Sequence, residues 1–233
     1  MATTDLYIQF MSAVTPHSTE RLFSLINGAF RDGTNKIHLL LNSPGGSVFH
    51  GLAIYNMLKG IPLEIVTHNF GTVDSIGIII YCAGKKRYCV PHARFLLHPV
   101  ATNFQQGASA DEHRIREIQN ALEIDQKNIA RIVGATTNKS EQEILKSIHN
   151  RETLDPEQAK KFGLVNSISS TLIPAGAHLE VIRESEANMP QIVAGQTLRA
   201  DTAPHTIPLQ LSPAPKSGAT NIYKSVISST KAF

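Results

Sequence analysis

The sequence predicts an α/β fold built around a largely parallel sheet. Across residues 1–172, short apolar runs typical of strands alternate with longer segments in which apolar residues recur at helical spacing. Parallel strands need crossover connections, usually helices, so this alternation favours a parallel sheet. Residues 173–233 differ, because they hold six of the twelve prolines among Ser, Thr, Ala and Gly. We expect that segment to be a proline-rich C-terminal extension, extended or partly disordered.

The first half of the domain repeats a strand followed by a helix. Apolar residues alternate over residues 6–10, which predicts a half-buried strand, and recur three and four positions apart over 19–30, which predicts a helix. The pair recurs as an apolar run at 37–41 and a helical pattern at 48–58. A third strand is expected at 63–67, broken a few residues later by a glycine.

The second half contains the longest helix. A buried helix is expected over residues 75–83, followed by strands at 87–90 and 94–98. A long amphipathic helix then runs over 109–134, with apolar residues along one side.

Capping signals place the helix starts. Two Ser and Glu pairs have the three-residue spacing of a capping box, and we expect each pair to open a helix. They are Ser109 with Glu112 and Ser140 with Glu143. Asp155 before Pro156 is expected to cap a last helix, which Gly163 ends before a strand over 164–168.

Composition narrows the class of protein. The 42% of hydrophobic residues is enough for a core, while a net charge of +3 without a long basic run argues against nucleic acid as a partner. Cys82 and Cys89 are too few for a disulfide framework and lie in apolar stretches, so we expect free thiols. The first residues lack the features of a signal peptide, and no apolar run reaches the ~20 residues that span a bilayer. We therefore expect a cytoplasmic protein without a membrane partner.

Three separate features could carry chemistry. Gly45 and Gly46 lie between a strand and a helix, where backbone amides can hold an anion, although a simple tight turn has the same pattern. Ser75 lies at a strand-to-helix junction as in a nucleophile elbow, or alternatively as a helix N-cap. His98 ends an apolar strand and could act as the base that a serine hydroxyl needs. Most of the ten histidines must be bystanders, so none of these features is distinctive alone.

Read together, the features resemble a known family. The matching runs are Asn42–Val48, Gly71–Gly77, Lys86–Tyr88 with Pro91, Phe95–Pro99 and Leu154–Val165. In order and spacing they are similar to the Clp protease proteolytic subunit family, over about residues 5–170. The resemblance implies a Clp/crotonase-type fold of repeated ββα units, with the long helix protruding as a handle. It also implies that residues 1–172 form a Clp-protease-like catalytic domain and that the protein is a ring-shaped homo-oligomer.

The resemblance assigns roles to four residues. It implies a serine endopeptidase that hydrolyses unfolded proteins or peptides, in the manner of ATP-dependent Clp proteases, through an acyl-enzyme on Ser75. His98 matches the general base, and the backbone amides of Gly46 and Ile76 match the oxyanion hole. This chemistry is coherent, since a base activates the hydroxyl and two fixed amides stabilise the developing oxyanion. It requires no cofactor and no metal.

The third member of the triad is unresolved. Arg151 stands at the position of the family's aspartate, and it cannot accept a hydrogen bond from the imidazole. Asn150 or Glu152 could take the place after a one-residue shift, and Glu152 is preferred because a carboxylate would also stabilise the imidazolium. A Ser-His dyad is the remaining alternative.

Other departures affect partners and function. Asp74 replaces a small residue of the family and is expected to be a solvated charge at a helix start, or a substrate contact. The family's N-terminal axial segment, which engages a ring-shaped ATPase, has no counterpart in this sequence, so an ATPase unfoldase partner is a hypothesis. The alternative functions are a crotonase-type acyl-CoA enzyme and a catalytically silent ring subunit.

Overall fold

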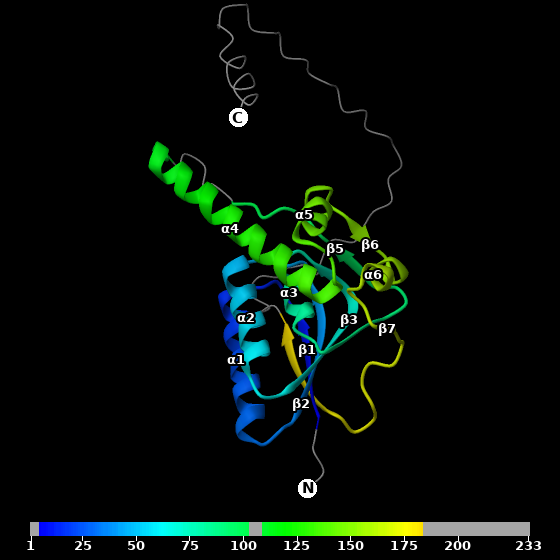
Figure 1. Cartoon of the computed structure of the whole chain (residues 1–233). Coiled ribbons are helices and arrows are strands. Elements are labelled where there is room, and N and C mark those ends of the chain that lie inside the picture. Colours follow the sequence, from blue (N-terminus) through cyan, green and yellow to red (C-terminus); the bar gives the residue numbers. More distant parts are fainter. Residues whose placement is uncertain (1–4, 103–108, 184–233) are drawn as a thin grey trace, which may run out of the picture. The chain divides into compact units, whose positions relative to one another are not determined.

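The computed structural model describes residues 5–102 and 109–183. These residues form an α/β domain in which helices α1 to α3 alternate with the first strands of the sheet (Figure 1). The part of the expected C-terminal extension beyond residue 183 lies outside the described residues. None of the described helices is long and apolar enough to cross a membrane.

The described strands make one eight-stranded sheet. The main path has the order β6-β5-β3-β2-β1-β8, and β4 pairs with β3 and β7 beside it. All pairs are parallel except β5 with β6. The strands are β1 (Leu6–Met11), β2 (Lys36–Ser43), β3 (Glu64–Asp74), β4 (Lys86–Cys89), β5 (Arg94–Leu96), β6 (Thr153–Leu154), β7 (Ser167–Ile168) and β8 (His178–Arg183).

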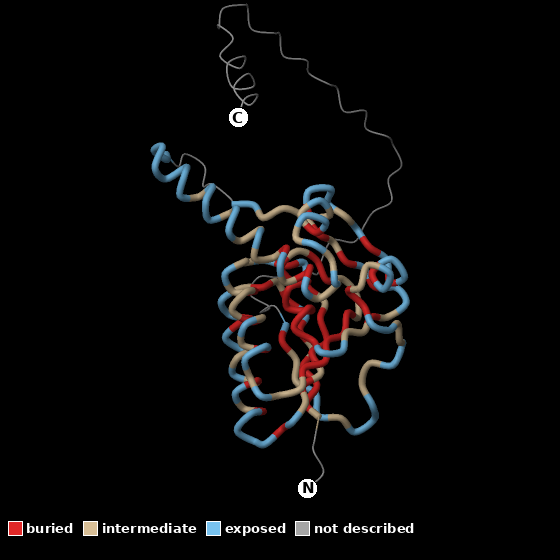
Figure 2. Tube along the Cα trace, viewed as in Figure 1, coloured by how far each residue is buried: buried red, intermediate tan, exposed pale blue. Residues whose placement is uncertain are grey.

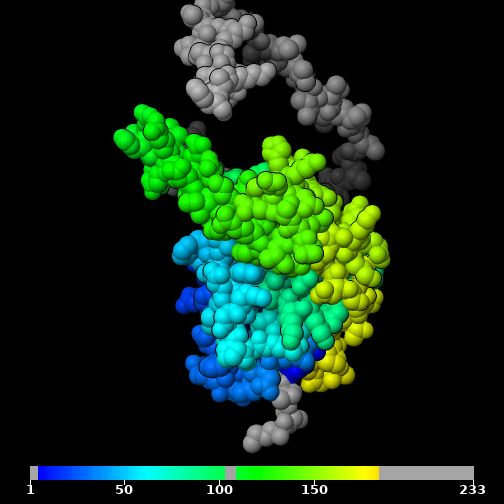
Figure 3. Space-filling view, viewed as in Figure 1, coloured from blue at the N-terminus to red at the C-terminus, as the bar shows by residue number. Residues whose placement is uncertain are grey.

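Six helices are described. They are α1 (Pro16–Arg31), α2 (Val48–Gly60), α3 (Gly77–Cys82), α4 (Glu112–Thr137), α5 (Glu141–His149) and α6 (Pro156–Phe162). The first part of α4 projects from the body of the domain as the predicted handle (Figures 1 and 3). Its exposed surface contrasts with the buried residues between the sheet and the helices (Figure 2). All six residues of α3 are buried, so the chain just before α3 is anchored in the core.

Strand β3 is longer than the sequence predicted. It does not break at Gly71 but continues to Asp74, pairing first with β4 and then with β5. The pairing of β3 with β2 shifts register after Leu41. Two side-chain amides bond to the backbone of β3 there: Asn42 Oδ1 accepts from Thr72 N at 3.0 Å, and Asn69 Oδ1 accepts from Gly71 N at 3.0 Å. The glycine permits a close approach, since a Cβ at Gly71 would lie 2.9 Å from Asn42 Oδ1.

The ends of α4 also differ from the prediction. Its N-cap is Asp111, whose side chain accepts from Arg114 N, so the expected capping box of Ser109 is wrong. The helix passes Gly134 and ends at Asn138 in a left-handed conformation. Gly134 instead makes room for the next turn, because a Cβ there would lie 2.7 Å from Lys139 O. The predicted caps Ser140 and Asp155 are confirmed, each in a capping box.

Two strands were not predicted. Strand β6 has only two residues, and β8 lies within the segment expected to be an extension. Strand β8 pairs in parallel with β1 along its whole length and buries Ile182 fully. Conversely, the strand expected over 164–168 is limited to Ser167–Ile168. Short edge segments of this kind carry little periodic signal.

Candidate active site

Ser75 occupies a tight connection between β3 and α3. Its φ of 58° lies in the left-handed region, which costs a residue with a side chain roughly 1–3 kcal/mol. Hydrogen bonds hold it on both sides: Ser75 N donates to Leu96 O at 2.8 Å, and Ile78 N donates to Ser75 O at 3.1 Å. The helix N-cap is Ile76 without a side-chain cap bond. The serine therefore has the geometry of a nucleophile elbow, not of a capping residue.

The glycine turn packs directly against this serine. Gly45 has a φ of 92°, and a Cβ on it would lie 2.6 Å from Ser75 Cβ and 3.2 Å from Ser75 Oγ. Gly46 has a φ of 143°, and a Cβ there would lie 2.4 Å from Val14 O. Hydrogen bonds from Val14 N to Gly45 O (2.7 Å) and from Ser47 N to Val14 O (2.8 Å) fix the turn. Both glycines are required by close approach as well as by conformation.

Two backbone amides near Ser75 are available to a ligand. The amides of Gly46 and Ile76 donate no hydrogen bond to any described residue. Both residues line the same small pocket of about 110 Å³ as Ser75 and His98. Backbone amides without a partner, on residues that line one pocket with a serine, are suited to stabilise an oxyanion.

His98 is oriented by a backbone carbonyl. Its Nδ1 lies 2.9 Å from Pro99 O, and a carbonyl can only accept, so Nδ1 carries the proton. The lone pair is then on Nε2, the nitrogen available to take a proton. Within the described part of the chain, no hydrogen bond joins His98 to Ser75. Catalytic hydrogen bonds are commonly long without substrate, so their shared pocket is the informative observation.

The loop expected to supply the third triad member runs beside His98. Glu152 O accepts from Leu97 N at 2.9 Å, which places this backbone next to the base. The side chains of Asn150, Arg151 and Glu152 make no hydrogen bond to His98 in the region that the structure describes. Arg151 is exposed with a φ of 53°. The role of Glu152 as a third catalytic residue stays a prediction.

Asp74 is not the solvated helix-start charge that was expected. It is the last residue of β3 and only 7% exposed, because the strand continues up to Ser75. Its Oδ2 pairs with Arg94 Nη2 at 2.6 Å, while its buried Oδ1 has no described partner. Burial raises the pKa of the Asp74 carboxyl, and Arg94 and more weakly His98 act in the opposite direction.

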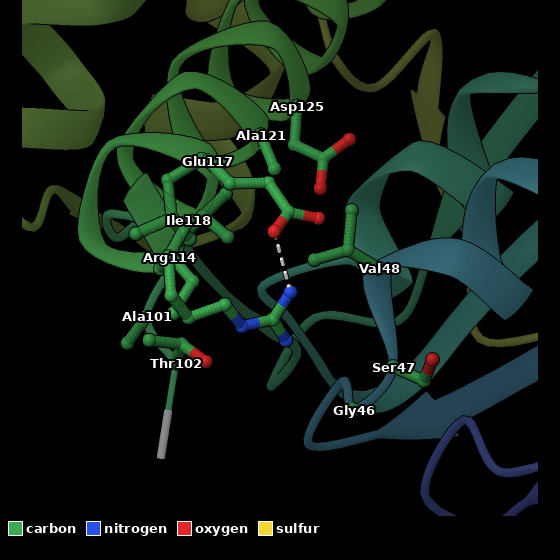
Figure 4. Close-up of a pocket in the computed structure, with 12 residues that line it drawn as sticks. Gly46, Ser47, Val48, Ala101, Thr102, Arg114, Glu117, Ile118, Ala121 and Asp125 are labelled. Carbon is green, nitrogen blue, oxygen red and sulfur yellow. Dashed lines mark hydrogen bonds and ion pairs between the residues drawn. The ribbon is translucent and has the colours of Figure 1, made fainter. Parts of the chain in front are cut away.

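A second, larger pocket adjoins the first. It has a volume of about 390 Å³ and lies between the start of α2 and the handle helix α4 (Figure 4). The two pockets share Gly46, Val48, Val100 and Ala101. Among the described residues that line the larger pocket, the charged ones come from α4: Arg114, Glu117 and Asp125. Sequence patterns did not single out this pocket, because its walls come from segments far apart in the chain.

No group of three or more His, Cys, Asp or Glu side chains among the described residues is placed to hold a metal ion. The two cysteines are free and buried, as predicted, and burial raises the pKa of each thiol to about 11. They are therefore poor candidates for nucleophiles at neutral pH.

Comparison with known proteins gives consistent matches. A family model described as Clp protease matches residues 2–171. ATP-dependent Clp protease proteolytic subunit 2 of Prochlorococcus marinus (strain NATL2A) is 36% identical over 140 residues, which cover 59% of this chain and 68% of the relative. ATP-dependent Clp protease proteolytic subunit 1 of Corynebacterium jeikeium (strain K411) is 33% identical over 139 residues, covering 59% and 72%.

A solved structure shares the fold. A point mutant of ClpP1 from Listeria monocytogenes matches with a TM-score of 0.63 and 24% sequence identity, covering 71% of this chain and 91% of that structure. At this identity the match supports a common architecture.

Proposed function

This chain belongs to the Clp protease family, and we propose that it is a serine endopeptidase acting on unfolded proteins or peptides. The observation that carries the proposal is the setting of Ser75. A serine in a left-handed turn shares one pocket with a histidine and with two backbone amides that have no described partner.

The geometry supports acyl transfer in two steps. His98 Nε2 takes the proton of Ser75 as Oγ attacks the peptide carbonyl, and the amides of Gly46 and Ile76 donate to the oxyanion that forms. The protonated imidazole then gives its proton to the leaving amine, which leaves an acyl-enzyme on Ser75. Water activated by His98 attacks the ester and releases the second product.

The Pro99 carbonyl performs one function of a triad acid, which is to orient the imidazole of His98. By accepting from Nδ1–H at 2.9 Å it fixes the tautomer that leaves Nε2 basic. A neutral carbonyl stabilises an imidazolium less than a carboxylate does, because it carries no net charge. We therefore expect turnover to be slower than with a full triad, unless Glu152 turns toward the ring in the substrate complex.

The assembly and its partners are part of the proposal. The proposal includes a cytoplasmic homo-oligomeric ring that receives substrate from an ATPase unfoldase. Relatives named as proteolytic subunits of an ATP-dependent protease support the link to an ATPase and to a larger assembly. The projecting helix α4 supports it too, since Ile115 and Ile124 on it are 54% and 59% exposed. Both side chains are therefore available for a contact with another subunit, which the proposal assigns to this helix.

Active-site labelling tests the proposal directly. A fluorophosphonate probe should modify Ser75, and Ser75→Ala should abolish both the labelling and the turnover of an unstructured protein or fluorogenic peptide. Turnover that survives Ser75→Ala would contradict the peptidase. Absent labelling with tight acyl-CoA binding would favour a crotonase-type enzyme, and absent labelling without such binding would favour a silent ring subunit.

A further inference from the structure

The pocket that holds Ser75 and His98 is apolar. Among the described residues that line it, His98 has the one side chain that titrates near neutral pH, and α3, α4 and α5 contribute aliphatic side chains. In the proposed acyl transfer His98 becomes an imidazolium cation, and an apolar setting disfavours that cation. A fixed negative charge nearby would therefore lower the barrier. This step rests on the proposed function of Ser75.

One buried carboxylate adjoins both catalytic residues. Asp74 is the one Asp, Glu, Lys or Arg residue that is buried in the described part of the chain. It directly precedes Ser75, and its partner in the pairing of β3 with β5 is Leu96, two residues before His98. A hydrogen bond of 2.8 Å from Ser75 N to Leu96 O joins the two strand ends. Neighbouring strands are ~4.8 Å apart, so Asp74 lies where the segments that carry the nucleophile and the base meet.

The charges of Asp74 and His98 attract each other. Burial raises the pKa of the Asp74 carboxyl, whereas the cations of Arg94 and His98 lower it. This interaction is reciprocal, since a cation that favours the carboxylate is itself favoured by it. Ionised Asp74 therefore favours the protonated ring of His98.

Arg94 does not cancel this effect. Its Nη2 lies 2.6 Å from Asp74 Oδ2, but the Arg94 side chain is more than half exposed, whereas that of Asp74 is buried. Water and salt screen an exposed charge much more than a buried one. In addition, the buried Asp74 Oδ1 has no described partner. The pair therefore acts on the interior as a partly uncompensated negative charge.

Other charged groups near the catalytic base are placed less favourably. Arg151 and Glu152, in the loop beside it, carry opposite charges on adjacent residues, and His149 at the end of α5 is exposed. Asp125 of α4 lines the larger pocket and not that of the base. None of these four described residues is buried as Asp74 is.

We propose that Asp74 is a positioning residue that acts through His98: its buried negative charge stabilises the imidazolium that forms when Ser75 attacks. The two functions of a triad acid are then divided, since the Pro99 carbonyl orients the ring and Asp74 supplies the charge. A charge that acts through space contributes less than a carboxylate hydrogen-bonded to the ring, so the expected effect is modest.

The titration of His98 tests this coupling directly. Diethyl pyrocarbonate acylates the neutral imidazole and spares the protonated ring. Its rate of reaction with His98, followed by mass spectrometry between about pH 5.5 and 8.5, gives the pH at which the ring is half protonated. Asp74→Asn keeps the shape of the side chain and removes its charge. It should lower that pH by about 0.5, a roughly threefold change in the protonation equilibrium.

Steady-state kinetics provide the second readout. Asp74→Asn should lower kcat about threefold with little change in KM, and it should move the acid limb of the kcat/KM profile to lower pH by a similar amount. A variant whose active site is merely distorted would lose activity without moving the acid limb.

Glu64→Gln is the matched control. Glu64 begins the same strand β3, pairs with Lys36 on β2 at 3.7 Å and lies ten residues from Asp74, roughly 30 Å along the strand. The control changes the net charge as Asp74→Asn does, and it should leave both readouts unchanged. A double variant, Asp74→Asn with Arg94→Met, removes the ion pair as a whole, and His98 should still be half protonated at a lower pH than in the wild type.

The two proposals fail in different ways. If fluorophosphonate does not label Ser75, the peptidase proposal falls, while an effect of Asp74→Asn on the titration of His98, measured in the Ser75→Ala background as well, would still support the coupling. If labelling succeeds but His98 titrates alike in Asp74→Asn and Glu64→Gln, or the double variant titrates as the wild type, this inference alone is overturned.

Discussion

Asp74 and Arg94 form an asymmetric pair next to the nucleophile. The Asp74 side chain is 9% exposed, whereas that of Arg94 is 52% exposed. Because folding raises the carboxyl pKa, the buried charge costs stability at neutral pH, and the arginine offsets part of this cost. Losing one partner therefore has a different effect from losing the other.

We expect Arg94→Ala to lower the free energy of unfolding by about 1–2 kcal/mol, since it leaves a buried carboxylate without its cation. Asp74→Ala should change it little or raise it by up to about 1 kcal/mol, because it removes the charge whose burial is unfavourable. Urea unfolding at pH 7 measures both. In the double variant the loss caused by Arg94→Ala should disappear; an additive loss would show that the arginine acts elsewhere.

A second prediction concerns Glu152. Since Pro99 O already accepts from His98 Nδ1, we expect Glu152→Gln to lower kcat by less than about tenfold. Loss of a true triad acid costs on the order of 10⁴. Glu157→Gln, an exposed residue in the first turn of α6, is the control. A loss of a thousandfold confined to Glu152→Gln would identify it as the acid.

These residues show what sequence patterns can and cannot provide. Ser75 and His98 were predicted from the order and spacing of motifs, and the structure brings both to one pocket. The orienting role of Pro99 could not be predicted, because every residue has a carbonyl and only folding selects one. Asp74 was misjudged because its burial depends on β3 continuing past Gly71, where the strand pairs with β5 and Thr72 N donates to Asn42 of the neighbouring strand.

At the scale of elements, the turn between β2 and α2 is expected to tolerate no side chain. Gly45→Ala places a Cβ at positive φ and 2.6 Å from Ser75 Cβ. We therefore predict that it abolishes fluorophosphonate labelling and lowers the free energy of unfolding by about 1–3 kcal/mol. Gly28→Ala in α1 is the opposite case, since nothing lies within 4 Å of the new Cβ. The free energy of unfolding of that variant, measured by thermal unfolding, should rise by about 0.5–1 kcal/mol, and fluorophosphonate should still label it. Equal effects at both glycines would contradict the packing argument.

Two histidines on neighbouring strands predict a pH dependence of stability. His68 of β3 is 5% exposed, and its Nε2 lies 3.1 Å from Nδ1 of His38 on β2, which faces Asp5 through Nε2 at 3.2 Å. Burial, with a smaller effect from His38, lowers the pKa of His68 from 6.5 to about 4. Burial also lowers the pKa of His38, against the opposing effect of Asp5.

Because the lowered pKa belongs to a base, the folded state resists protonation that the unfolded chain accepts. Stability should therefore be unaffected by His68 above pH 6.5 and should fall as the pH drops toward 4, by up to ~3 kcal/mol from this residue. Urea unfolding at pH 7 and pH 4.5 measures the difference. His68→Leu should remove most of it, and an unchanged difference in that variant would refute the assignment.

Elements with strong periodicity were predicted more accurately than short ones. Helix α2 begins at Val48 as expected, and the caps of α5 and α6 are confirmed. The strands at the ends of the sheet, β6 and β8, gain their order from pairing with β5 and β1. Their sequences alone give too few alternating positions to distinguish them from loops.

At the scale of the whole molecule, the predicted α/β class with a Clp/crotonase-type fold is confirmed. The alternation of β and α patterns was sufficient for the class, and the motif order was sufficient for the family. The larger pocket beside that of Ser75 could not be predicted from the chain, since it forms only where α4 passes over the start of α2. The proposed oligomer depends on the same helix.

The last prediction tests that oligomer through α4. In this structure the helix leaves Ile115 and Ile124 more than half exposed, and we expect both to be buried between subunits. Replacing both by Glu should dissociate the assembly or reduce it to a smaller species in sedimentation velocity, because a carboxylate without a partner is costly in an interface. Lys127→Glu, an exposed position on the same helix, gives the control for added negative charge. If the double variant sediments as the wild type, α4 does not carry the contact; if the wild type is itself a monomer at micromolar concentration, the ring proposal is wrong.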